Sequence, residues 1–193
     1  MVVRVVCTLG LVVALAVSGC RSATSRFYTL TSTAAPYDAP LASYGVIVGP
    51  VTVPASVDRP EFVVQVAPNR VALDEFNRWA APLGDSIARV VAADLAALLG
   101  TSRVAAAPLA NFEPAYRVTI AVQQFDTIPG EGVVVDAVWT VRRTRGGVTR
   151  SGRTVAREDV TDKSFDALAA AHSRALEVVS REIAAAIRAE ERS

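Results

Sequence analysis

Few side chains in this chain of 193 residues could do chemistry, and the first to consider is its one histidine, His172. A hydrolase would need that histidine beside a serine on a strand–turn–helix elbow of the Gly-x-Ser-x-Gly type, and the sequence has no such motif. His172 falls inside a predicted helix, four residues after Leu168 and four before Leu176. We therefore expect it at the edge of an apolar stripe, without a catalytic role.

Metal and cofactor chemistry finds no better support. No His or Cys pair has the spacing of metal ligands. The acidic group formed by Glu158, Asp159 and Asp162 precedes a predicted helix, where carboxylates favour the positive end of the helix dipole. Gly130 and Gly132 flank Glu131 in a turn between strands, which is no phosphate-binding loop. The sequence thus predicts a protein that is not an enzyme and that has no cofactor or metal.

The cysteines indicate a different chemistry, which is attachment of lipid. Arg4 is followed by 13 uncharged residues, 5–17, which is the layout of a secretory signal and is too short to span a bilayer as a helix. Val17-Ser18-Gly19-Cys20 then resembles a lipobox, in which the cysteine sulfur receives diacylglycerol. We expect residues 1–19 to be a signal peptide, Cys20 to be the lipidation site, and the folded domain to contain no thiol, because Cys7 leaves with the signal.

The residues after Cys20 bear on where the protein resides. Residues 20–25 form a lipidated start and a short polar tether, and residues 26–193 form one periplasmic domain. Arg21 stands where an aspartate would favour the inner membrane, by resemblance to the sorting rule of Gram-negative lipoproteins. The periplasmic face of the outer membrane is therefore expected. Removing Arg4 leaves 19 Lys+Arg against 19 Asp+Glu, and this neutral balance does not favour nucleic acid as a partner.

Hydrophobic periodicity predicts the elements of the domain. Strands are expected at residues 26–30, 44–53, 61–67, 70–73, 103–106, 116–123, 133–142 and 148–157. A helix capped by Asp85 or Ser86 should end at Gly100, and a second should cover residues 164–188. Because both helices are amphipathic, the expected fold is α/β of the α+β type, with a mainly antiparallel sheet and the two helices packed on one face.

One predicted hairpin is rich in arginine and has no acidic residue from residue 137 to residue 157. Its basic residues include Arg142, Arg143, Arg145, Arg150 and Arg153. Such a patch could meet anionic headgroups or an acidic partner. The alternative is a solvated face that protects a sheet edge, contributes little to folding and has no partner.

Three stretches resemble a known family: residues 48–54, Asp58-Arg59-Pro60, and residues 76–83 with the sequence Phe-Asn-Arg-Trp-Ala-Ala-Pro-Leu. They are similar to the ABC-type transport auxiliary lipoproteins, the PqiC-like family. The lipobox, the Phe-Tyr-x-Leu stretch and the closing helix match in the same order. The residues that stand out in the motif, as scaffold or as partner contact, are Arg59, Pro60, Trp79, Pro82 and Leu83.

The resemblance implies a non-enzymatic outer-membrane component of an MCE-type lipid transport system. Its partners would be an MCE-domain protein and, through it, an inner-membrane permease and ATPase. The membrane would be reached through the lipid anchor, and a homo-oligomer is conceivable around a symmetric partner. The alternative is a free-standing envelope lipoprotein that binds a small ligand or stabilises another assembly.

Overall fold

The computed structural model describes residues 24–36, 42–106, 112–147 and 149–192. Within these ranges the strands form two sheets, one of five strands and one of three, and two helices pack against them. None of the helices described is both long enough and apolar enough to cross a membrane.

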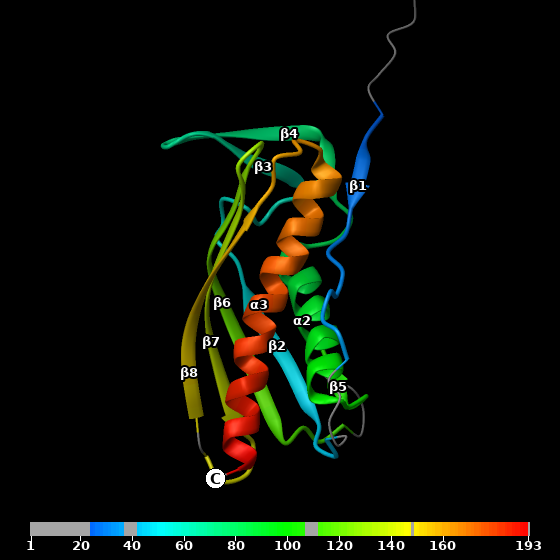
Figure 1. The fold of residues 1–193 in the computed structure, drawn as a ribbon, viewed down its shortest axis with the longest axis vertical. Coiled ribbons are helices and arrows are strands. Elements are labelled where there is room, and N and C mark those ends of the chain that lie inside the picture. Colours follow the sequence, from blue (N-terminus) through cyan, green and yellow to red (C-terminus); the bar gives the residue numbers. More distant parts are fainter. Residues whose placement is uncertain (1–23, 37–41, 107–111, 148, 193) are drawn as a thin grey trace, which may run out of the picture.

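The larger sheet forms the long side of the molecule (Figure 1). Its strand order is β5-β2-β6-β7-β8. The strands are β5 (Val104–Ala105), β2 (Val46–Thr52), β6 (Tyr116–Ile128), β7 (Gly132–Arg143) and β8 (Thr149–Asp159). β2 is parallel to both β5 and β6, whereas β6, β7 and β8 form antiparallel pairs.

Alternation along β6 and β7 produces one buried face. Val118, Ile120 and Val122 on β6, and Val135 on β7, are almost fully buried. These side chains form the core together with the apolar stripes of the helices. In Figure 1 both helices lie side by side on this one face of the sheet.

The two helices are α2 (Leu83–Leu99) and α3 (Phe165–Glu191). The expected cap of the first was wrong, since α2 begins at Leu83, with Pro82 in the N-cap position and Asp85 within the first turn. The backbone explains this start, because the carbonyl of Pro82 already accepts the N–H of Ser86 at 3.0 Å. The predicted end at Gly100 is confirmed, with φ 64° in the left-handed region that glycine adopts without strain.

The smaller sheet has the order β1-β4-β3 and lies at one end of the molecule (Figure 1). Its strands are β1 (Arg26–Tyr28), β3 (Glu61–Ala67) and β4 (Arg70–Trp79). β3 and β4 form an antiparallel hairpin that extends across this end, and β1 runs parallel to β4 at Asn77–Trp79.

The α+β class is confirmed. The expected single, mainly antiparallel sheet is corrected to two mixed sheets, because the crossover through α2 makes β2 parallel to β6. β4 is also longer than the predicted strand 70–73, since it continues through Phe76 to Trp79. The register between β2 and β6 shifts between Val48 and Val51, on either side of Gly49-Pro50.

Candidate functional site

Cys20, the predicted lipidation site, lies outside the described residues, but the chain that follows β1 is well defined. We call residues 31–34 the N-terminal strap. The Ser32 hydroxyl donates to Asp94 Oδ1 at 2.6 Å, and the Ala34 N–H donates to the same oxygen at 3.4 Å. Asp94 Oδ2 accepts from the Ser180 hydroxyl at 2.9 Å. One buried carboxylate on α2 therefore joins the strap to α3.

Two further hydrogen bonds attach the strap to α3 directly. The Thr31 N–H donates to Ser173 Oγ at 3.1 Å, and the Thr33 hydroxyl donates to Glu177 Oε2 at 2.5 Å. Asp94 is fully buried, and this burial raises the pKa of its carboxyl group, although hydrogen bonds from Ser32 and Ser180 act in the opposite direction. The exposed strap is thus joined to both helices by hydrogen bonds to their buried polar side chains.

The Arg-Pro turn and the Trp-Ala-Ala-Pro-Leu segment, expected from the sequence to act as scaffold or partner contact, meet in space. The Trp79 N–H donates to the Pro60 carbonyl at 2.6 Å. A pocket of about 380 Å³ lies between the two segments, bordered by Arg59, Pro60, Trp79, Pro82 and Leu83. Pro82 and Arg59 are exposed at this pocket, whereas Leu83 is buried at the start of α2.

Trp79 is a core residue as well as a pocket wall. Its side chain is 6% exposed and stacks on Phe62, with ring centroids 4.1 Å apart. Phe62 in turn contacts Tyr28 and Phe165 edge to face, which connects β1, β3 and α3. The aromatic cluster fixes the small sheet to the body of the domain.

Four of the five arginines of the expected basic patch form ion pairs with carboxylates from elsewhere in the chain. Arg153 makes a two-pronged contact with Asp136, at 2.9 and 2.6 Å, and Arg150 pairs with Glu190 on α3. Arg143 lies 3.8 Å from Glu191, and Arg145 lies 3.1 Å from Glu113. Arg142 is exposed and has no ion pair among the residues that the structure describes.

Two of these arginines, Arg150 and Arg153, pair with buried acids, while their own side chains are 46% and 65% exposed. The carboxylate side chains of Asp136 and Glu190 are 3% and 6% exposed. Hydrogen bonds from Arg153 lower the pKa of Asp136 below its usual range. The charge of the patch is therefore partly neutralised by acids that the fold brings to it. Residues 137–157 contain no acid, so the sequence of the hairpin did not indicate these partners.

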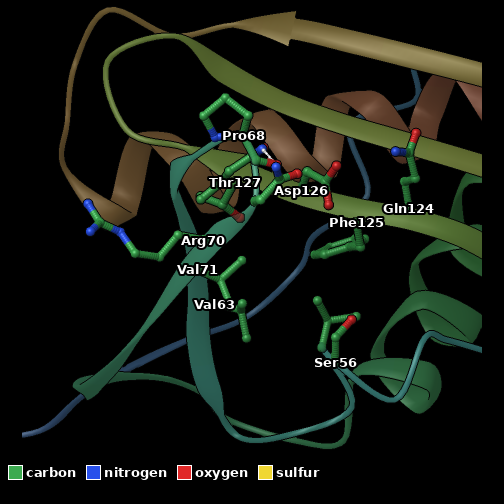
Figure 2. A pocket seen from close by; sticks show the side chains of 12 residues that line it. Ser56, Val63, Pro68, Arg70, Val71, Gln124, Phe125, Asp126 and Thr127 are labelled. Carbon is green, nitrogen blue, oxygen red and sulfur yellow. Dashed lines mark hydrogen bonds between the residues drawn. The ribbon is translucent and has the colours of Figure 1, made fainter.

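A cleft beneath the β3–β4 hairpin was not predicted. It has a volume of about 360 Å³ and lies between the hairpin and the end of β6. Figure 2 shows Val63 and Val71 on the side of the hairpin that faces Phe125, while Arg70 extends away from them. Burial raises the pKa of Asp126, which lines the same cleft. The available signal was the apolar residues on both sides of the Pro68-Asn69 turn, too many for an ordinary exposed hairpin.

His172 lies in the core and not, as expected, at its edge. It is fully buried, stacks on Phe125 with ring centroids 3.9 Å apart, and its Nε2 is 2.8 Å from Thr127 Oγ1. Burial lowers the pKa of His172 to about 3, so the ring is neutral at physiological pH. No group of acids, histidines or cysteines suited to a metal ion occurs in the described part of the chain.

The fold defines the structural class: an α+β scaffold of two mixed sheets and two helices, with a pocket between the two segments of the motif. Comparison with protein families narrows that class. Residues 28–184 match the model described as ABC-type transport auxiliary lipoprotein component, and the chain belongs to this family.

Solved structures share the fold. A crystal structure of an uncharacterised protein is 21% identical, with a TM-score of 0.68, over 86% of this chain and 99% of the other. A protein from Xanthomonas campestris is 18% identical, with a TM-score of 0.71, over 87% of this chain and all of the other, 100%. A PelC dodecamer from Paraburkholderia phytofirmans, 18% identical over 81% and 94% of the two chains, reaches a TM-score of only 0.42 and supports no argument. No curated protein matches the chain.

Proposed function

We propose that this chain is an outer-membrane lipoprotein that acts, without catalytic turnover, as an auxiliary component of an MCE-type lipid transport system driven by an ABC transporter. The observation that supports this most is the family match over residues 28–184, which covers the strap, both sheets and most of α3. The family description names an auxiliary transport component and a lipoprotein; the outer membrane and the MCE partner are the steps that we add.

The anchor is the first part of the proposal. The sequence before Cys20 has the order of a lipoprotein signal, and Cys20 would bear the acyl chains. Each buried CH₂ contributes ~0.8 kcal/mol, so several chains hold a protein firmly where a single chain binds reversibly. Arg21 after the cysteine supports transfer to the outer membrane.

The partner is the second part. A lipid-anchored domain at the far side of the periplasm suits docking of an MCE-domain protein that bridges from the inner-membrane permease and ATPase. The pocket formed by Pro60, Trp79 and Pro82 offers apolar area next to the exposed charges of Asp58 and Arg59. Interfaces of this kind combine an apolar centre with a polar rim.

Crosslinking in intact cells tests the function. The full chain with an affinity tag after Ser193 is crosslinked, solubilised in detergent and captured, and its partners are identified by mass spectrometry. An MCE protein should be enriched over a capture from cells that express a tagged, unrelated outer-membrane lipoprotein. If no transporter component is captured from cells that express both, the alternative of a free-standing envelope lipoprotein replaces this proposal.

A further inference from the structure

Exposed apolar side chains gather on the small sheet. Among the described residues, seven large hydrophobic side chains are exposed, and five of the seven belong to β1, β3 or β4. These five are Phe27, Val66, Val71, Leu73 and Phe76, which are 64%, 46%, 58%, 46% and 44% exposed. Soluble surfaces rarely concentrate large apolar groups in this way without a contact that covers them.

The outer half of the β3–β4 hairpin is exposed although its base is buried. Phe62 and Trp79 at the base are 0% and 6% exposed. Val71 and Leu73, in contrast, pair with Gln65 and Val63 across the hairpin, and Val71 borders the cleft that separates the hairpin from the body. The fold itself therefore leaves the apolar groups of the outer half uncovered.

The place where the N-terminal tether enters the fold indicates what covers these exposed apolar side chains. Arg26 begins β1, which pairs with Asn77–Trp79 of β4, so the tether enters the fold at the small sheet. Five residues separate Cys20 from Arg26, and such a stretch reaches at most ~20 Å. If Cys20 is lipidated, the bilayer surface must lie within that distance of Arg26, at the start of the small sheet's β1.

The charges of the small sheet suit a phospholipid interface. Arg26 and Arg70 are exposed, and long basic side chains can keep their charge among headgroup phosphates while apolar neighbours enter the acyl boundary. Two of the three acids of the small sheet are already used by the fold: Glu61 pairs with Arg78 at 3.0 Å, and Asp74 Oδ1 accepts the N–H groups of Phe76 and Asn77 at 3.0 and 2.8 Å. The third, Glu75, is exposed, so the exposed charges that remain are Arg26, Arg70 and this one acid.

We propose that the exposed apolar side chains of the β3–β4 hairpin, together with Phe27, lie in the headgroup region of the phospholipid bilayer and form a second membrane contact besides the lipid anchor. This inference rests on the proposed anchor at Cys20. It also fixes the orientation of the domain. The small sheet lies on the membrane, and the end with the β7–β8 turn and the C-terminal end of α3 points away from it (Figure 1).

Single cysteines test this directly, because Cys7 and Cys20 are the only native cysteines and neither would be free in the mature lipoprotein. Leu73→Cys and Phe76→Cys report on the hairpin. Arg145→Cys, at a side chain that is 91% exposed in the β7–β8 turn, is the matched control. Each full chain is exported, purified in detergent, labelled with the fluorophore NBD, and reconstituted into vesicles of phosphatidylethanolamine and phosphatidylglycerol.

At positions 73 and 76 the emission should shift to the blue, and brominated acyl chains should quench it several-fold more than at position 145. Iodide in the water should quench position 145 most. Adding Leu73→Asp to the Phe76→Cys chain should reduce the lipid quenching, whereas adding Val155→Asp, an exposed apolar site on β8, should not. Thermal unfolding followed by circular dichroism confirms that each variant is folded.

Equal iodide quenching at positions 73, 76 and 145 would overturn the proposal. So would shielding at 73 and 76 that lipid bromine does not quench, since that result indicates a protein contact such as a second copy. The mass of the N-terminal peptide separates this outcome from failure of the anchor. A chain without acyl groups that stays off the vesicles overturns both proposals, whereas an acylated chain with a water-exposed hairpin overturns only this one.

Discussion

At the scale of single residues, Asp94 is the most informative group, because one buried carboxylate connects the strap, α2 and α3. Its pKa is raised in the folded state by burial. A raised folded pKa gives stability that is complete below the unfolded value of about 3.9 and is lost as pH rises through the folded pKa. The ionised carboxylate is therefore the less favourable form in the fold.

We predict that Asp94→Asn changes the pH dependence of stability. The unfolding free energy of the native protein relative to Asp94→Asn should fall as pH rises from about 4 to neutrality, since asparagine does not ionise. Urea unfolding at several pH values measures this. Asp85→Asn, an exposed acid on the same helix, is the control for losing one charge. A difference between native protein and Asp94→Asn that is constant with pH would contradict the prediction.

The arginines of the patch should contribute unequally to the free energy of unfolding. Arg150→Glu would place a second carboxylate beside Glu190, whose side chain is 6% exposed, so we expect a loss of about 1–3 kcal/mol in the free energy of unfolding. Arg142→Glu changes an exposed side chain and should stay within about 0.5 kcal/mol. Denaturant unfolding of the two single variants decides the matter. Equal, small effects would show that the ion pair on α3 does not contribute.

At the scale of elements, the contact between β7 and β8 depends on a missing side chain. Gly152 pairs with Trp139, and a Cβ at this position would lie 2.2 Å from the Trp139 ring. The ring in turn donates its N–H to Thr154 at 2.9 Å. The glycine therefore lets the tryptophan lie flat across the neighbouring strand.

We predict that Gly152→Ala lowers the unfolding free energy by about 1–3 kcal/mol, since the ring must move in a packed region. Ser151→Ala, the exposed neighbour on the same strand, should cost less than about 0.5 kcal/mol. Thermal or urea unfolding, with tryptophan fluorescence as the signal, compares them. A Gly152→Ala protein as stable as Ser151→Ala would mean that the ring can shift without cost.

The elements also show how far the sequence predicts the fold. Alternation in β6 and β7 and the stripes of α2 and α3 were sufficient to predict strands, helices and their buried faces, because burial of one side imposes a period on the chain. The extent of β4 was not predictable in this way. Most of this strand, including Val71 and Leu73, is exposed, so no buried face imposes a period on it, and a register irregularity after Glu61 interrupts its pairing with β3.

The site was predictable only in part, for a similar reason. The motif with Pro60 and Trp79 could be picked out by residue type, and the fold brings its two halves together. The partners of Arg150 and Arg153 could not be foreseen, since Glu190 is 40 residues and Asp136 is 17 residues away along the chain. Long-range ion pairs and the cleft under the hairpin arise from tertiary packing, which local patterns do not record.

At the scale of the whole molecule, the small sheet and the strap form one continuous connection, which the proposed anchor at Cys20 would extend. The tether enters at β1, the strap joins both helices, and the exposed hairpin lies at the same end. This arrangement suits a domain that is held against a surface at one end, with the pocket at Pro60, Trp79 and Pro82 beside that end. Lipidation of Cys20 is the condition on which this account depends.

We predict that Cys20→Ser abolishes lipidation. The variant should keep its signal peptide, because the lipoprotein peptidase acts only after the cysteine is acylated, and it should leave the outer-membrane fraction in a density gradient. Cys7→Ser, within the signal itself, is the matched control and should be processed and located like the native chain. Outer-membrane recovery of Cys20→Ser equal to that of Cys7→Ser would show that another feature provides the attachment.

The most direct measurement is the mass of the N-terminal peptide of the mature native protein, purified from membranes. The account predicts a chain that begins at Cys20 and bears three acyl chains on that residue. An unmodified N-terminus downstream of Cys20, or an unprocessed chain that still begins at Met1, would contradict it.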